Sequence, residues 1–554
     1  MFPTPLKRIV KSVLLPLWGI SCSASLVCSP MYAGGGSDTE VSGKIVTPSG
    51  RGLSGVQVML LRNDYDPAFG GRIPANDIET TDTSGGYRFA NVSAGTYDIQ
   101  AADPASGARI LMGNVGVARG AATLLLAADS LRKPVLLMVN LPDSIAAMQG
   151  YVVARGTTMY KRKNAGDTSL FFDSVAQGTI PALMFETSAS SPGVRLLTNA
   201  TIGPFDTTTL NPFPGWLHSA KILVNTSITG VILTTPATGF ALAVRLSAAT
   251  FPFSQARHGG ADIRFTTAAG KPVPFEIAQW DSANSQAVVW VGLDTVLPNS
   301  TDQFVRMFWG NAAASSASNP QAVFDTARGY AGVWHFEESQ AGVGTAGLYK
   351  DATPDAANGD DSVASTAQAS WVGNAASFAA PDKIVVSRPV ADLAAAAFTI
   401  CVWVNFSAPG GVVFSKNKTG VTADTGDKEL WFGDSAASGA PGLRPTFGGI
   451  GQGTLTAQRD MGINQWHFYS LRWMPAAAAF FIDGGLCGFT GSYTPQAADD
   501  PADKFIIGSD GTHYLSGAID ELHVSRTARS DDWIMLAFEN QRQDQHLVTI
   551  EIEK

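Results

Sequence analysis

Hydrophobic and polar residues alternate in short runs along most of this chain, and Gly, Pro, Asn and Asp separate the runs. From Val41, the sequence VSGKIVTPSGRGLSGVQVMLLR contains two such runs, and Val56, Val58 and Leu60 alternate in the second. Such alternation places apolar side chains on one face of a strand. We expect the two runs to form a β-hairpin around the Gly-rich turn, and similar runs further on predict an all-β chain of tandem β-sandwiches.

The next segment, TTDTSGGYRFANVSAGTYDIQA, continues this strand and turn pattern. Asp82–Gly86 is expected to form a tight turn, Tyr87 and Phe89 to face a core, and Thr96–Ile99 to form the following strand. Together with the opening runs, these residues resemble the carboxypeptidase regulatory-like module, which implies a seven-stranded sandwich of the prealbumin type over residues 41–130.

An internal repeat follows, because Phe172–Ile180 aligns without gaps on Phe89–Tyr97 with identical Phe, Val, Gly and Thr positions. We interpret residues 131–203 as a second, degenerate sandwich that opens with Lys133–Asn140. A turn-rich stretch, residues 204–219, is expected to be a linker.

Residues 220–326 resemble a bacterial domain of unknown function that often precedes LamG-like modules in envelope proteins. The resemblance implies a β-sandwich but no activity. It rests on Asp262–Phe265, Pro274–Ile277, Trp280-Asp281, Ala287–Val291, Phe308–Asn311 and Phe324-Asp325.

The last third, residues 327–554, contains an ordered series of motifs that includes YAGVWHFEESQ, FTICVWVNF, QWHFYSLRW and LSGAIDELHVSRTARSDDWI. These motifs resemble the LamG-like jelly-roll family, which implies a concanavalin A-like sandwich as the final domain. The aromatic residues of its strands are expected in the core rather than on a ligand platform: Trp334, Phe336, Trp403, Phe468 and Phe480.

Length and composition agree with several β domains in one chain. A chain of 554 residues is too long for one hydrophobic core, and 57 Gly, 30 Pro and only 15% charged residues suit short strands and many turns. The net charge is −9, and no extended Lys/Arg cluster appears after the first dozen residues. We therefore expect no nucleic-acid partner.

The N-terminus predicts export. Lys7, Arg8 and Lys11 precede a mainly apolar stretch that ends near Val27. We interpret residues 1–28 as an export signal and residues 29–40 as a Gly/Ser-rich tether. No other stretch approaches the roughly 20 apolar residues that span a bilayer, so the mature chain is expected to have no transmembrane segment.

Cysteines leave two questions open. Cys22 and Cys28 lie where the sequence resembles a bacterial lipoprotein processing site, which implies an N-terminal lipid anchor; cleavage after Ala24 or Ala33 would instead release a freely secreted chain. The protein is thus expected at the outer membrane or cell surface as a lipoprotein, or in the periplasm or medium. Cys401 and Cys487 could form a disulfide or stay as two buried thiols.

The sequence predicts no catalytic site. Retaining glycosidases need two carboxyl groups about 5–5.5 Å apart, and adjacent acids in one strand point to opposite faces. This separates Glu337 from Glu338 and Asp520 from Glu521. The chain also lacks HExxH and GxSxG motifs.

A structural Ca²⁺ ion is the cofactor that the LamG-like resemblance implies, with Asp520, Glu337 and Asp382 as ligands. Alternatively, Asp520 caps a hairpin by accepting backbone N–H groups.

For a ligand, exposed aromatic residues on loops are the candidates: Trp431, Phe432, His513 and Tyr514. We expect a cell-envelope protein that binds polysaccharide or another envelope ligand through its last domain. The alternatives are a structural adhesin that contacts protein and a glycoside hydrolase.

Overall fold

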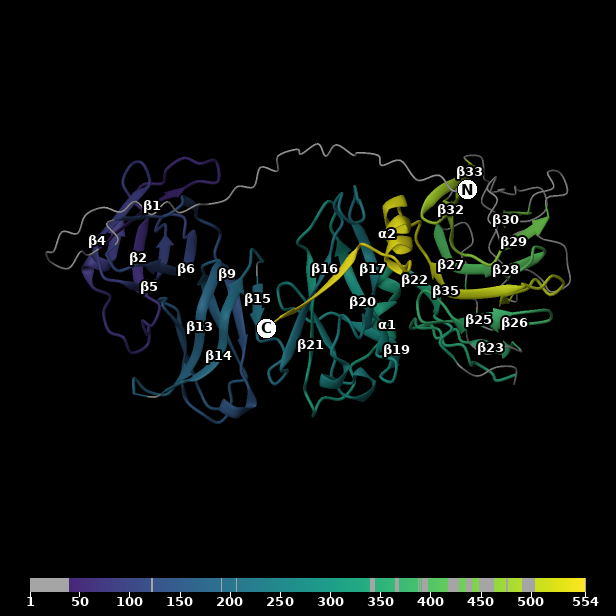
Figure 1. Ribbon diagram of the computed structural model, residues 1–554, viewed down its shortest axis with the longest axis horizontal. Coiled ribbons are helices and arrows are strands. Elements are labelled where there is room, and N and C mark those ends of the chain that lie inside the picture. The colour runs from purple at the N-terminus through teal and green to yellow at the C-terminus, as the bar shows by residue number, and fades with distance from the viewer. Residues whose placement is uncertain are drawn as a thin grey trace, which may run out of the picture.

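The structure is a computed structural model that describes residues 39–120, 123–190, 192–205, 207–338, 344–363, 368–386, 388, 390, 397–416, 428–434, 441–447, 463–474, 477–490 and 504–553. Four β-sandwiches lie in a row from the N-terminal to the C-terminal part (Figure 1). The α-helices within these ranges are α1 (Pro320–Val323) and α2 (Asp531–Gln541). The predicted all-β fold is confirmed. No helix in the described part is both long enough and apolar enough to cross a bilayer.

The first sandwich has two sheets around a core that includes Val41, Val58, Phe89 and Ile99. One sheet has the order β4-β1-β7 with β8 beside β1, and the other contains β6-β5-β2-β3. The strands are β1 (Thr39–Val46), β2 (Gln57–Arg62), β3 (Ile78–Thr80), β4 (Gly86–Val92), β5 (Gly95–Ala102), β6 (Arg109–Val117), β7 (Thr123–Leu125) and β8 (Asp129–Ser130).

The predicted opening hairpin is wrong. β1 pairs with β4, β7 and β8, whereas β2 pairs with β3 and β5 in the opposite sheet. Both strands alternate as expected, but the segment between them crosses from one sheet to the other. Alternation defines the buried face of a strand and leaves its pairing partner undetermined.

The second sandwich repeats the strand pairing of the first. β9 pairs with β12 and β15 as β1 pairs with β4 and β7, and β13 lies between β10 and β14 as β5 lies between β2 and β6. Asn91 and Ser174 occupy equivalent positions in the repeat, and both have positive φ. Its strands are β9 (Val135–Asn140), β10 (Gly150–Arg155), β11 (Tyr160–Lys163), β12 (Ser169–Val175), β13 (Gly178–Glu186), β14 (Val194–Ile202) and β15 (Thr207–Leu210).

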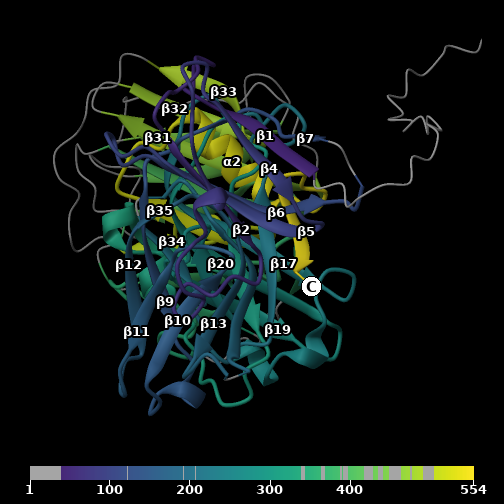
Figure 2. The same cartoon turned by 90° about the vertical axis from the view of Figure 1, so that its left-hand side faces the viewer.

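The middle sandwich includes the C-terminal strand of the chain. One sheet has the order β18-β21-β16-β36 and the other β17-β20-β19. Figure 1 shows the yellow C-terminal strand among the teal strands, and Figure 2 shows the same end from the side of the first sandwich. The strands are β16 (His218–Val224), β17 (Ala237–Ser247), β18 (Arg264–Thr267), β19 (Phe275–Asp281), β20 (Gln286–Val296), β21 (Phe304–Trp309) and β36 (Val548–Glu553).

These pairings differ from the expected domain limits at two places. β15 lies inside the expected linker 204–219 but pairs with β9 of the second sandwich. β36 lies inside the expected last domain 327–554 but pairs with β16. Both strands are short, and each is separated in the sequence from the other strands of the sandwich that it completes.

The C-terminal sandwich consists of sheet β24-β25-β35-β27-β31-β32-β33, with β22 beside β35, and sheet β23-β26-β34-β28-β29-β30. The strands are β22 (Tyr330–Trp334), β23 (Gly359–Ser362), β24 (Gln368–Ala369), β25 (Asn374–Phe378), β26 (Lys383–Val386), β27 (Phe398–Phe406), β28 (Gly411–Lys416), β29 (Lys428–Asp434), β30 (Pro441–Phe447), β31 (Trp466–Met474), β32 (Ala477–Ile482), β33 (Gly485–Thr490), β34 (Phe505–Ile507) and β35 (Gly517–Ser525).

The five predicted core aromatics are all buried, but they divide between two cores. Trp334, Phe336 and Phe480 lie between the two sheets of the C-terminal sandwich. Trp403 and Phe468 face outward from it and join the core of the middle sandwich, together with residues of α2. The outer face of the β35 sheet is therefore covered by the middle sandwich, and the apolar residues on that face belong to the core of the middle sandwich.

Candidate functional site

A β-bulge in β35 directs three polar side chains to the covered face of the sheet. Cys401 pairs with His523 and Trp403 with Asp520, so two residues of β35 lie opposite the single Val402. Glu521 has φ of 48° at this bulge. Apolar neighbours in β35 point into the C-terminal core, whereas Asp520, Glu521 and His523 face away from it.

β22 adds a histidine beside this bulge. Trp334 at the end of β22 pairs with Leu522, and both side chains lie in the C-terminal core. His335 follows Trp334 and, by alternation, points to the opposite face. His335 and β35 thus bring their polar side chains to one place under the middle sandwich.

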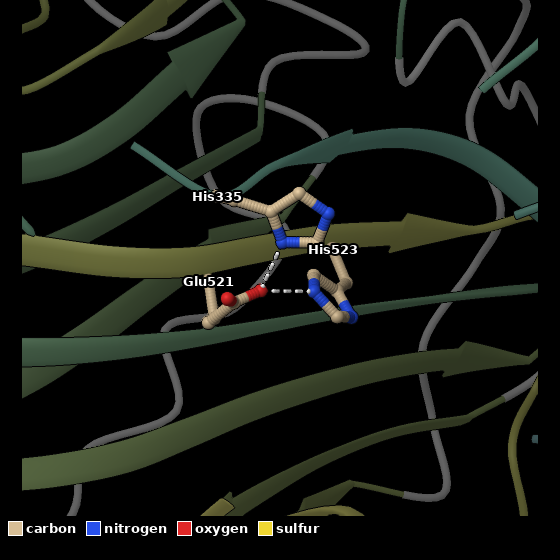
Figure 3. Close-up of side chains that lie close together, drawn as sticks. All are labelled: His335, Glu521 and His523. Atoms are coloured by element: carbon tan, nitrogen blue, oxygen red, sulfur yellow. Dashed lines mark hydrogen bonds and ion pairs between the residues drawn. The ribbon is translucent and has the colours of Figure 1, made fainter. Parts of the chain in front are cut away.

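The cluster consists of two imidazoles on one carboxylate oxygen (Figure 3). His335 Nδ1 lies 2.7 Å from Glu521 Oε2, and His523 Nε2 lies 2.8 Å from the same oxygen. The exposed fractions of His335, Glu521 and His523 are 7%, 1% and 4%. Their ligand atoms all lie within 4.8 Å of one another, and among the described residues this group has the arrangement to hold a metal ion.

The middle sandwich supplies the walls of the cluster. Glu276 Oε2 in β19 lies 3.2 Å from His335 Nε2, the ring nitrogen on the far side from Glu521. Trp290 in β20 stacks on the His335 ring at a centroid distance of 5.6 Å, and Phe324 lies 5.2 Å away. The cluster therefore lies at the interface between the two domains.

Burial and neighbouring charges perturb the acids. Burial raises the pKa of Asp520 well above its usual value, and the charge of Glu521 adds to this effect. Burial also raises the pKa of Glu337 to about 8. For Glu521, burial acts in the same direction, but the neighbouring His335 and His523 outweigh it and hold the pKa below its usual value.

A buried cation completes the surroundings. Arg245 in β17 donates from Nε to the Trp371 carbonyl over 3.1 Å and from Nη2 to the Gln541 carbonyl. Burial lowers the pKa of Arg245 to about 10, although the nearby carboxylates of Asp520 and Glu521 oppose that shift. The middle sandwich thus contributes a positive charge to this acid-rich interface.

Two of the three predicted Ca²⁺ ligands, Asp520 and Glu337, accept hydrogen bonds from residues of one turn, residues 370–374. Asp520 accepts a hydrogen bond from Ser370 Oγ over 2.6 Å, and Glu337 accepts from the backbone N–H and the side chain of Asn374. Burial raises the pKa of Asp520 most, and the charges of Glu521 and Glu337 add to this effect. Asp382 instead accepts the Ala379 N–H in the turn before β26. Ca²⁺ binding stays a prediction.

Sequence reasoning did not select His335, Glu521 or His523. The signal was present, because WHFEE and AIDELHV contain polar residues between apolar core residues. Polar residues on the alternate face usually contact solvent, and a single sequence does not show that another domain covers them. The expected separation of Asp520 from Glu521 was wrong, because the bulge at Glu521 breaks the alternation.

None of the four predicted ligand residues belongs to this cluster. His513 and Tyr514 belong to a turn before β35, and Asp510 Oδ2 lies 2.8 Å from His513 Nδ1. The His513 side chain is 42% exposed. Trp431 and Phe432 lie in β29, but their side chains fall outside the described part. Cys22 and Cys28 also fall outside it.

The structure contradicts the possible disulfide between Cys401 and Cys487. Cys401 in β27 is buried, and Cys487 in β33 is exposed. β31 and β32 lie between their strands, which corresponds to about 14 Å at about 4.8 Å per strand spacing. A disulfide requires Cα atoms less than about 7 Å apart. The alternative of two buried thiols holds for Cys401 alone.

A surface pocket of about 530 Å³ opens between the first two sandwiches. Its lining combines apolar, aromatic and basic side chains, which can contact a ligand. None of the residues selected from the sequence lies in it. The lining includes Met59, Arg109, Tyr151, Tyr160, Lys161 and Phe172.

Comparisons with protein families agree with this architecture. Residues 378–535 match the family model described as the concanavalin A-like lectin/glucanases superfamily. The C-terminal sandwich is a LamG-like, concanavalin A-like domain. Residues 259–339 of the middle sandwich match a domain of unknown function, DUF2341. Both predicted resemblances are confirmed, and the carboxypeptidase regulatory-like resemblance of residues 41–130 stays a prediction. Glu276 and His335 lie in one matched segment, and Glu521 and His523 lie in the other.

Several solved structures are similar to part of the chain. Domain 4 of AbnA, a GH43 extracellular arabinanase from Geobacillus stearothermophilus, in complex with arabinotriose, is 14% identical; the match covers 37% of this chain and 97% of that one, with a TM-score of 0.30. The Ruminococcus gnavus IT-sialidase CBM40 bound to alpha2,3 sialyllactose is 17% identical over 30% and 96%, with a TM-score of 0.25. The SAP-like pentraxin from Limulus polyphemus is 14% identical over 28% and 85%, with a TM-score of 0.23. No curated protein matches the chain.

Proposed function

We propose that this protein is an exported cell-envelope protein that binds polysaccharide through its concanavalin A-like domain and catalyses no reaction. The observation that carries the proposal is the match of residues 378–535 to a superfamily of lectins and glucanases. That superfamily contains both binding proteins and enzymes by its description, so the position of the carboxyl groups distinguishes the two.

Burial of the acids favours binding over hydrolysis. Asp520 and Glu521 have exposed fractions of 0% and 1% under the middle sandwich. A glycosidase must place its two carboxyl groups on either side of a sugar ring. Acids without solvent contact do not meet that requirement, whereas the turn with His513 and Tyr514 is open to a ligand.

The arrangement of domains supports a stalk. In Figure 1 the first two sandwiches extend away from the concanavalin A-like domain. We assign them, with residues 41–130 as a prealbumin-type module, the role of holding the binding domain away from the envelope. Attachment through Cys22 or Cys28 would anchor this stalk, and mass spectrometry of the mature N-terminus detects the acyl chains or, alternatively, cleavage after Ala24 or Ala33.

Pulldown with insoluble polysaccharides and glycan arrays tests the binding function. The full mature chain is the appropriate material, because side chains on the outer face of the concanavalin A-like domain belong to the core of the middle sandwich. We expect saturable retention on at least one polysaccharide. Binding to proteins alone would favour the adhesin, and release of reducing sugar would favour a glycoside hydrolase. The predicted Ca²⁺ ion would be supported if a chelator abolishes glycan binding and added Ca²⁺ restores it.

A further inference from the structure

The interdomain cluster contains the donor set of a transition-metal site. His335 Nδ1, His523 Nε2 and a carboxylate oxygen of Glu521 converge from two adjacent strands (Figure 3). Two imidazole nitrogens and one carboxylate suit Zn²⁺, whereas Ca²⁺ and Mg²⁺ prefer oxygen ligands alone. The chemistry of the donors thus differs from the Ca²⁺ site that the sequence suggested.

An unpartnered oxygen gives independent support. Both imidazoles contact Glu521 Oε2, while Glu521 Oε1 is buried and has no hydrogen-bond partner. A buried carboxylate oxygen without a partner is costly, because burial removes the water that would solvate it. A cation held between the two rings and the carboxylate would satisfy this oxygen.

The residues around His335 are arranged like those that support a metal-bound histidine. Metal-bound histidines usually direct the other ring nitrogen to a carboxylate, which fixes the tautomer and the ring orientation. Glu276 Oε2 lies 3.2 Å from His335 Nε2 in this position. Trp290 and Phe324 form an apolar wall on the same ring. In the metal-bound form Nε2–H of His335 would donate to Glu276, which leaves the Nδ1 lone pair to bind the ion.

We propose that His335, Glu521 and His523 bind one divalent transition-metal ion, with Zn²⁺ as the matching ion, and that Glu276 is a positioning residue for His335. Glu521 and His523 lie in β35 of the concanavalin A-like sheet, and His335 directly follows β22. Glu276 lies in β19 of the middle sandwich. The ion would therefore stabilise the contact between the two domains. Since the ligands are almost fully buried, its role is structural, and the proposal does not depend on carbohydrate binding.

The alternative is an ion-pair network without metal. In that case His335 carries protons on both ring nitrogens and donates to Glu276 and Glu521 at once, while His523 donates a second bond to the Glu521 carboxylate. This arrangement leaves Glu521 Oε1 unsatisfied. Metal content distinguishes the two arrangements directly.

The experiment uses the full mature chain, purified without affinity metals and analysed by inductively coupled plasma mass spectrometry. We expect about one equivalent of Zn²⁺ per chain, because the cluster offers one set of three ligands. After chelator treatment, Co²⁺ added at one equivalent should give ligand-field absorption bands, and Ca²⁺ should not compete for the site. Zn²⁺ should also raise the unfolding temperature of the chelator-treated protein, because it binds the folded state.

Variants locate the ion. We expect His335→Gln and His523→Gln to lose stoichiometric Zn²⁺, and Glu276→Gln to bind Zn²⁺ about 10- to 100-fold more weakly. His467→Gln is the matched control, because His467 Nδ1 lies 2.8 Å from Asp483 in the same domain but outside the cluster. This control should retain one equivalent.

The proposal is overturned if the wild-type chain holds no stoichiometric metal and shows no Co²⁺ bands, or if the folded His335→Gln and His523→Gln variants retain the metal. Where these variants do not fold, the X-ray absorption spectrum of the wild-type protein takes their place. Two imidazole ligands in that spectrum support the site, and one or none overturns it.

Discussion

Arg306 in β21 and Glu553 in β36 form a two-point ion pair across β16, the strand that lies between them. Arg306 Nε lies 2.8 Å from Glu553 Oε2, and Nη2 lies 3.1 Å from Oε1. Ser219 Oγ in β16 donates to the same carboxylate over 2.6 Å. The last residues of the chain thus close a sheet that begins more than 300 residues earlier in the sequence.

Glu553→Gln should weaken the attachment of β36. The pair is partly exposed, so we expect a loss of about 0.5–1 kcal/mol, seen as an about two- to fivefold faster hydrogen exchange in β16. Deletion of residues 548–554 should have a larger effect, because it makes β16 an edge strand. Mass-spectrometric exchange of residues 218–224 measures both, with the exposed Glu551→Gln as control. Equal protection in wild type and deletion would contradict the pairing.

Asp532 attaches α2 to the middle sandwich. Its Oδ2 accepts hydrogen bonds from the backbone N–H and the hydroxyl of both Thr234 and Thr235, over 2.6–3.0 Å. Asp532→Ala should destabilise the docked helix by about 2 kcal/mol, because four donors lose one charged acceptor. Hydrogen exchange of residues 531–541 measures the effect. Asp531→Ala, which removes an exposed ion pair with Arg472, should change it little.

The same carboxylate predicts a response to acid. Burial acts to raise the pKa of Asp532, but the hydrogen bonds from Thr235 and Thr234 outweigh it and hold the pKa below its usual value. The contribution of Asp532 should therefore be complete above the unfolded pKa of about 4 and decrease as the pH falls through the lower folded value. If the wild type remains as much more stable than Asp532→Ala at pH 2 as it is at neutral pH, this assignment is contradicted.

The sequence supported the fold class more firmly than the strand pairing. Alternation correctly indicated that β1 and β2 each bury one face, but pairing depends on contacts that alternation does not encode. The TIEIE segment of β36 alternates clearly, yet its partner lies in another domain. At the site, family resemblance pointed to Asp520 and Glu337, while Glu521 required knowledge of a bulge and His335 required knowledge of the covering domain.

Asp98 in β5 should make stability depend on pH in the opposite direction. Its side chain is fully buried, and Oδ2 has no hydrogen-bond partner, although the Asn114 N–H donates to Oδ1. Burial raises the pKa of Asp98 to about 6. The folded state therefore keeps this proton after the unfolded state has lost it, and stability should fall by ~2 kcal/mol as the pH rises from about 4 to 6.

Asp98→Asn should abolish that decrease, because the amide keeps an acceptor for Asn114 and cannot ionise. Pulsed hydrogen exchange gives the urea concentration at which β5 loses half of its protection. This midpoint, measured between pH 4 and 7.5, reports how the stability depends on pH. Asp82→Asn is the matched control, since hydrogen bonds from Ser84 lower the pKa of Asp82 in an exposed turn. A pH dependence that Asp98→Asn leaves unchanged would assign the effect to other groups.

The two cysteines of the concanavalin A-like domain should differ in reactivity. Burial raises the pKa of Cys401 to about 11, and its thiol is shielded from solvent, whereas Cys487 is exposed. Because the thiolate is the reactive form, iodoacetamide at pH 8 should alkylate Cys487 and leave Cys401 unmodified until the chain unfolds. Peptide mapping under non-reducing conditions measures this, and a disulfide-linked peptide pair would contradict the observed strand order.

The turn that carries His513 and Tyr514 should contribute to glycan binding. Asp510 orients it, because its carboxylate accepts the backbone N–H groups of Thr512 and His513 over 2.7 and 2.6 Å and lies next to the His513 ring. Leu515 is buried in the core directly after it. This fixed base lets the two rings meet a sugar with little loss of conformational entropy, which favours binding.

Tyr514→Ala and His513→Ala should each weaken binding to the polysaccharide by about tenfold. This corresponds to about 1.4 kcal/mol, which lies within the range of about 0.5–1.5 kcal/mol that an aromatic contact contributes in addition to its buried area. Affinity electrophoresis in gels containing the polysaccharide measures the change. Phe171→Ala is the control, because Phe171 is 52% exposed but belongs to the second sandwich and does not line the pocket there. If both turn variants bind like the wild type while remaining folded, the ligand contacts another surface, and the side chains of Trp431 and Phe432 are the next positions to vary.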